Sequence, residues 1–174
     1  MYAHLQAHVG GWWDGVLHPV RSPGHLVTMI VVGLVGGIGV RAGRTAWALP
    51  AAFVGAMVVF GSIAAALHRG FDVDALVLVM IGALVAVLLA PPRYTRVAAP
   101  LVVVACGALH GLAHGTDRGG RSRPGAYLAG FTFTGCLILA VGSIVGAATG
   151  RSLSARARRR RQVATLPADD HALV

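Results

Sequence analysis

The sequence contains no lysine and no glutamate, and only 12% of its 174 residues are charged. Surface helices of soluble domains are often stabilised by Glu–Lys pairs one turn apart, and no such pair exists in this chain. At the same time 56% of the residues are hydrophobic, which is too large a share for a soluble domain of this size. The composition therefore excludes an ordinary soluble domain and places the chain in a lipid bilayer.

Cysteine and the common catalytic or targeting signals are also scarce. Cys106 and Cys136 both lie inside apolar segments, so they do not indicate the disulfide framework of a secreted protein. The first 16 residues lack a basic start followed by an apolar core, so we expect the first span to insert unaided or a signal to lie upstream. No G-x-x-x-x-G-K-[ST] motif and no nucleophile–base–acid arrangement occurs, so we expect no enzyme.

Long apolar runs are what the sequence does contain. Each is close to the roughly 20 residues that a helix needs to cross about 30 Å of hydrocarbon, where only internal hydrogen bonds satisfy the backbone. We therefore predict an all-α polytopic membrane protein with about five transmembrane helices in one membrane domain, residues 1–150. The stretch before the first span carries a Trp pair and helix breakers, which indicates an interfacial or re-entrant segment. The predicted spans are 25–41, 46–67, 75–91, 97–115 and 125–149.

The distribution of arginine predicts the orientation. With the C-terminus inside, the inner segments hold ten Arg and the outer segments five, which favours N-out and C-in. These arginines lie in loops and in the tail, so orientation explains the net charge of +9 and nucleic acid is not expected as a partner. We expect residues 151–174 to form a basic, disordered cytoplasmic tail that rests on anionic lipid, with docking of a cytoplasmic protein as the alternative.

Glycine recurs every fourth residue in three of the predicted spans. Such stripes let helices approach closely, and we expect them to serve packing within the chain, with a homo-oligomer as the alternative. The three stripes are Gly33 and Gly37; Gly107, Gly111 and Gly115; and Gly142, Gly146 and Gly150.

Histidines gather at the outer ends of the predicted spans. Cys106, His110 and His114 lie four residues apart and share one face of a helix, while His18 and His25 reach the same membrane level from the first span. Ionisable side chains within a membrane tend to line a pathway, and imidazole suits Ni, Zn, Cu and Fe. Without a thiolate cluster or a carboxylate cage, we expect transient capture of a transition metal rather than a structural zinc or calcium site. His4, His8, His68 and Asp117 fall on the same side.

Four segments in order resemble the HupE/UreJ family of hydrogenase and urease accessory proteins. They are H-P-V-R-S-P-G-H-L-V-T-M at 18–29, R-T-A-W-A-L-P at 44–50, A-L-H-G-L-A-H-G at 108–115 and Y-L-A-G-F at 127–131. The resemblance implies a permease for nickel, with cobalt as the alternative, in the bacterial inner membrane, serving metalloenzyme maturation.

The chain departs from the family pattern at three positions. In H-P-x-x-G-x-D-H-L the family's Gly is replaced by Ser22 and its Asp by Gly24, and in the last span Leu139 stands where the family usually has His. The H-G-x-A-H-G motif is intact, with Asp117 near the acidic position that often follows it. The resemblance therefore leaves open whether metal preference or transport itself has changed.

The sequence thus favours a divalent-metal permease that captures its ion on the outer side and carries no permanent cofactor. A diverged accessory or scaffold protein that does not transport is the first alternative. A haem-b module with His25 and His110 as axial ligands is the second. The predicted metal ligands are His18, His25, His110 and His114, with weaker candidates in Cys106, Asp117 and His68.

Overall fold

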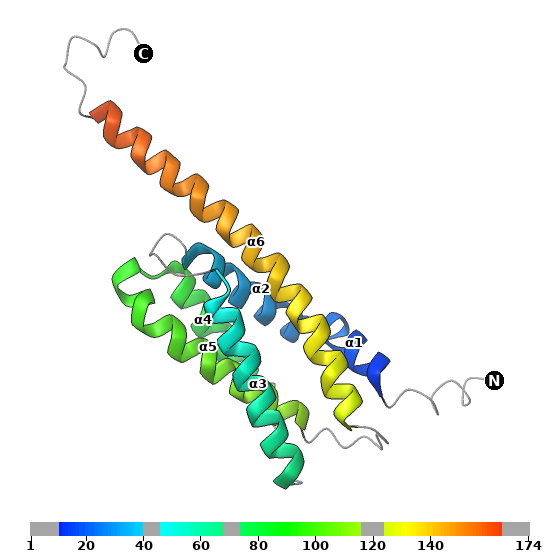
Figure 1. Ribbon diagram of the computed structural model, residues 1–174. Helices are drawn as coiled ribbons and strands as arrows, with labels where there is room; N and C mark the ends of the chain where they lie inside the picture. The colour runs from blue at the N-terminus through cyan, green and yellow to red at the C-terminus, as the bar shows by residue number, and fades with distance from the viewer. Residues whose placement is uncertain (1–10, 40–45, 68–73, 116–123, 165–174) are drawn as a thin grey trace.

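The computed structural model describes residues 11–39, 46–67, 74–115 and 124–164, and all of its regular structure is α-helical (Figure 1). The predicted all-α class is therefore confirmed, and each of the five predicted spans corresponds to one helix. The helices are α1 Trp12–Arg21, α2 Pro23–Ile38, α3 Ala48–Leu67, α4 Asp74–Leu89, α5 Pro92–Gly115 and α6 Pro124–Ala164.

Three of these helices, α3, α5 and α6, are long and apolar enough to cross a membrane, and α1 and α2 pass the same test together as one pair bent by 80°. Helix α4 has 16 residues and is about 24 Å long, shorter than roughly 30 Å of hydrocarbon. The expected number of five crossings is therefore not confirmed. Large apolar side chains are exposed along the helices, as lipid contact requires, including Leu78 at 70% and Leu89 at 79%.

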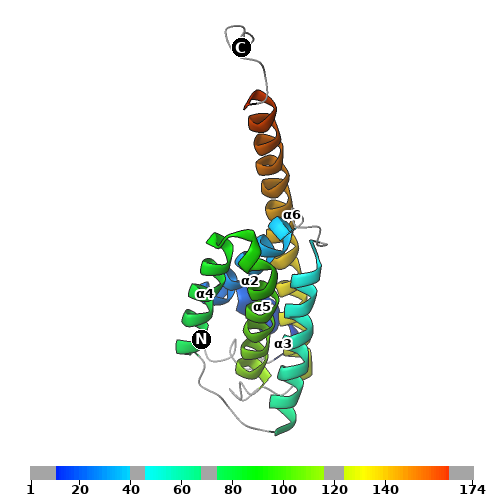
Figure 2. The same cartoon turned by 90° about the vertical axis from the view of Figure 1, so that its left-hand side faces the viewer.

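The helices form two closely packed groups joined through a common core. α6 packs along α2 and α1, α3 packs along α5, and α4 contacts both α5 and α2. Figure 2 shows α4, α5 and α3 side by side, with α2 and α6 behind them. Their fully buried side chains form the core, among them Met29, Phe53, Met57, Leu84 and Phe131.

Six of the eight glycines in the stripes lie at close helix contacts, which supports the prediction that they serve packing within the chain. A Cβ atom on Gly33 would lie 2.6 Å from the Leu139 carbonyl oxygen, and one on Gly142 would lie 2.7 Å from that of Ile30. Gly107 and Gly111 meet α3 in the same way, at the carbonyls of Phe53 and Met57. Backbones at such distances leave no room for a side chain.

The segment before the first span is more regular than its glycines and proline predict. Residues 12–21 form α1, in which Gly15 and Pro19 are buried, and Gly15 lies against the backbone of α6 at Tyr127. The chain leaves the helix only at Ser22, whose φ of −102° and ψ of 105° are extended. Pro23 explains this break, because the residue before a proline is driven out of the helical region. The result is a bent pair of helices that is either a broken span or a re-entrant segment, so the predicted interfacial or re-entrant segment stays a prediction.

The prediction that the basic tail is disordered is wrong for residues 151–164. Helix α6 continues through them without interruption, and Figure 1 shows it projecting beyond the other helices toward the C-terminus. Two physical reasons explain this: the stretch lacks glycine and proline, and extending an existing helix needs no new nucleation. The block of like charge is solvated on an exposed helix instead. Residues 165–174 lie outside the described part of the chain.

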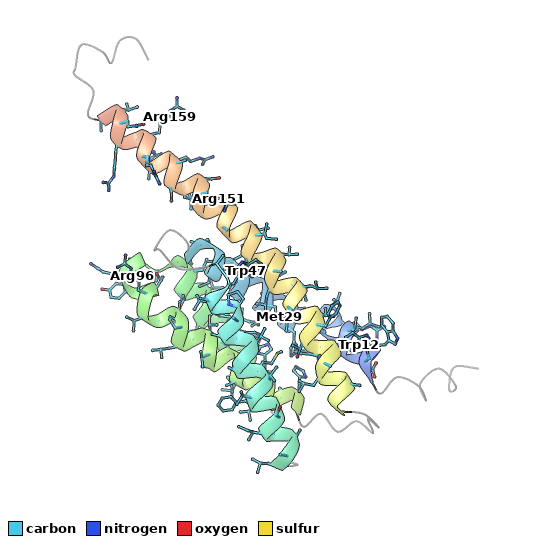
Figure 3. All side chains as sticks on the ribbon, in the orientation of Figure 1. Trp12, Met29, Trp47, Arg96, Arg151 and Arg159 are labelled. Carbon is cyan, nitrogen blue, oxygen red and sulfur yellow. The ribbon has the colours of Figure 1, made fainter. Side chains whose placement is uncertain are left out.

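Aromatic and basic side chains mark the two ends of the bundle. Trp12 lies at one end, and Trp47, Arg96 and Arg151 lie toward the other (Figure 3). Tryptophan at both ends and arginine concentrated at one is the pattern of a membrane protein with its basic end inside. The N-out, C-in orientation itself stays a prediction.

A methyl group at Gly37 should destabilise the bundle. It would lie 2.5 Å from the Ala147 amide nitrogen and also meet the Ser143 carbonyl oxygen, whereas a Cβ on Gly55 has nothing within 4 Å. Both Gly37→Ala and Gly55→Ala gain helix propensity by the same substitution. The difference between their free energies of unfolding therefore reports packing alone. We expect Gly37→Ala to lose about 1–3 kcal/mol relative to Gly55→Ala in detergent unfolding. Equal stability of the two variants would contradict the close α2–α6 contact.

Candidate metal centre

Three histidines from three helices meet near the Trp12 end. His18 lies on α1, His25 on α2 and His114 in the last turn of α5, and their ligand nitrogens all lie within 4.8 Å of one another. The bend between α1 and α2 brings the first two together, with ring centroids 5.2 Å apart. We call His18, His25 and His114 the histidine triad. His25 and His18 are half-buried, and His114 is 8% exposed.

The triad is compact enough to hold one ion. The Nε2 atoms of His25 and His114 are 2.6 Å apart, so that one ring carries a hydrogen and donates it to the other. Two nitrogens on one tetrahedral or octahedral ion, each at about 2.0–2.1 Å, would be roughly 3 Å apart. A small opening of this pair, with the shared hydrogen moved from Nε2 to Nδ1 of the same ring, would admit a metal.

The outward nitrogens of two triad rings meet hydroxyl groups. Ser22 Oγ lies 2.5 Å from His25 Nδ1, and Tyr127 OH lies 3.5 Å from His114 Nδ1. Metal-bound histidines usually have the second ring nitrogen held by an oxygen in this way, which fixes the orientation of the ring. Both rings are therefore arranged to present Nε2 to the triad.

His110 lies one turn before His114 on α5 and is fully buried. Its Nδ1–H donates to the Cys106 carbonyl oxygen at 2.9 Å, which leaves Nε2 with a lone pair. Within the described part of the chain this Nε2 is buried and has no hydrogen-bond partner. The ring lies 4.9 Å from His25 and 6.5 Å from His114, so His110 adjoins the triad through His25 without belonging to it.

Aromatic rings of α6 close the site on one side. The Phe131 ring lies 4.5 Å from His114, 5.8 Å from His18 and 6.0 Å from His25, and Tyr127 lies 6.0 Å from His18. Both aromatic side chains are buried. They cover one side of the histidine triad with apolar surface, while His18 and His25 remain partly exposed. The sequence placed both in a family-like segment but gave no sign that they face histidines.

The weaker ligand candidates from the sequence, and the positions that depart from the family pattern, lie outside the triad or outside the described residues. Cys106 is buried, and its sulfur lies 3.9 Å from His110 Nδ1, outside the triad. Asp117 and His68, with His4 and His8, lie outside the described residues. Leu139, at the family's histidine position, is 2% exposed in the apolar core, and Gly24 offers only its carbonyl, which accepts a hydrogen bond from Thr28.

Comparison with known proteins identifies the family of the chain. A family profile described as HupE / UreJ protein matches residues 1–166. Protein HupE of Rhizobium leguminosarum bv. viciae is 35% identical over 133 residues, which cover 75% of this chain and 67% of that protein. No solved structure gives a significant match. The helical membrane bundle, the order of its histidine motifs and these matches together show that the chain belongs to the HupE/UreJ family.

Proposed function

We propose that the protein is an inner-membrane permease that carries a divalent transition metal inward, with nickel favoured and cobalt as the alternative. The observation that supports it most is the histidine triad, whose ligand nitrogens lie within 4.8 Å of one another at one end of a membrane bundle. The HupE/UreJ family is associated with nickel and cobalt transport for hydrogenase and urease, which agrees with an imidazole donor set.

The triad is the capture site in this proposal, and His110 is the next position of the ion. His110 lies one turn earlier on α5, farther from the Trp12 end, and its buried Nε2 carries a lone pair with no partner in the described structure. The His25 ring contacts both His114 and His110. An ion can therefore keep one bond to His25 while its other ligands change, which lowers the barrier to leaving the triad.

The direction of transport follows from the expected orientation. With the Trp12 end outside and the Arg151 end inside, the triad faces the side from which the ion arrives. A potential of about 100 mV, inside negative, favours inward movement by about 2.3 kcal/mol per charge and by twice that for a divalent ion. Neutral imidazoles bind weakly enough to release the ion, because no carboxylate of the described residues joins the triad.

One observation bears on each of two other functions, in favour of the first and against the second. A scaffold that no longer transports agrees with Leu139, which fills the apolar core where the family usually has a histidine. A haem-b module would use His25 and His110, but these rings are in contact at 4.9 Å and leave no room for a porphyrin between them. The permease explains both the triad and the unpartnered nitrogen of His110.

Metal binding tests the capture site. We expect calorimetric titration of detergent-purified protein with Ni²⁺ to give one ion per chain, and His25→Ala to weaken binding by at least ~100-fold because a ligand is lost. Cys106→Ala is the matched control, since this buried side chain lies outside the triad. An absorption spectrum of the same sample would show a haem band if the redox alternative held. Wild-type protein that binds no metal would favour the scaffold.

A transport assay distinguishes capture of the ion by the triad from its onward transfer to His110. We expect proteoliposomes loaded with a metal-sensitive dye to take up Ni²⁺ and, more slowly, Co²⁺ when the interior is negative. His110→Ala should keep binding within about threefold of wild type, because the triad is intact, and should lower uptake at least tenfold. Loss of binding in this variant would instead make His110 a capture ligand. Unchanged uptake would remove His110 from the pathway.

A further inference from the structure

Ser22 joins the two helices that carry His18 and His25. Its backbone is extended, its N–H donates to the His18 carbonyl at 3.0 Å, and its own carbonyl accepts from the Leu26 N–H at 3.1 Å. The residue therefore ends α1 and begins α2 through its backbone alone. These bonds do not need a side chain, so the hydroxyl is available for another purpose.

A serine at the start of a helix normally caps it, by accepting a hydrogen bond from a backbone N–H of the first turn. Ser22 makes no such bond, although it is the N-cap residue of α2. Its Oγ lies 2.5 Å from Nδ1 of His25, the third residue of that helix. Other hydroxyls on the helices, including those of Thr28 and Ser143, donate to the carbonyl four residues earlier.

We propose that Ser22 is a positioning residue that holds His25 in the orientation needed for metal capture. A neutral imidazole that binds metal through Nε2 keeps its hydrogen on Nδ1, and Ser22 Oγ accepts that hydrogen. The opposite edge of the ring then points Nε2 at His114, whose own Nε2 lies 2.6 Å away. Gly24, beside His25 in the sequence, has no side chain with which to do this. The inference rests on the proposed metal capture by the triad.

Substitution of the hydroxyl tests this role. We expect Ser22→Ala to bind Ni²⁺ about 10–100-fold more weakly than wild type, which is the usual effect of removing an oxygen that orients a metal-bound histidine. Ser22→Thr keeps the hydroxyl and should restore binding to within about threefold. Thr28→Val is the matched control, because it removes a hydroxyl from the same helix that bonds only to a backbone carbonyl. It should bind as wild type does.

A second measurement does not depend on any variant folding. Nitrogen-15 spectra of histidine-labelled wild-type protein should show His25 with its hydrogen on Nδ1 when Zn²⁺, a diamagnetic probe, is bound through Nε2. Coordination through Nδ1 would overturn the proposal. Equal Ni²⁺ affinity of wild type and Ser22→Ala would also overturn it while leaving metal capture intact. Absence of binding by wild type would instead refute the proposed function itself.

Discussion

The 80° bend between α1 and α2 is the constraint on which the site depends. A straight helix through residues 18–25 would place the two histidines two turns apart along one axis, about 10 Å from each other. The bend brings their rings to 5.2 Å, close enough to share an ion. Pro23 sets the position of the break, and Ser22 occupies the extended residue that results. The histidine triad is therefore built around an interruption between α1 and α2.

Close backbone packing then holds this bent segment in place. Gly15 lets α1 approach the backbone of α6 at Tyr127, and Gly33 and Gly37 let α2 do the same farther along. Because α6 also carries Tyr127 and Phe131, the contact that fixes the bend places these rings against the triad. The small residues of α1 and α2 and the aromatic residues of α6 thus act together, because the close backbone contacts bring Tyr127 and Phe131 against the histidine triad.

Much of this arrangement could be predicted from residue types and spacing. Apolar length indicated each of the helices α2 to α6, and the four-residue spacing of His110 and His114 put both on one face of a helix. The tail was predicted incorrectly, because charge and composition describe residues 151–164 but not the helix that precedes and extends into them. The contacts of Ser22 and Tyr127 with the histidines were not predictable, since each depends on which ring atom the hydroxyl meets across a bend or between helices.

The sequence by itself determined that the chain is an apolar, all-helical membrane protein, and it supplied the candidate imidazole ligands, because these follow from composition, apolar length and local periodicity. Only the tertiary structure decided which imidazoles share a site and which stands apart. His110 and His114 look equivalent in the H-G-x-A-H-G motif. Yet His114 joins the triad, whereas His110 is buried beside it and its Nε2 has no hydrogen-bond partner in the described structure. The difference arises because α5 brings His114, and not His110, level with His18 of α1, which spacing along one helix cannot specify.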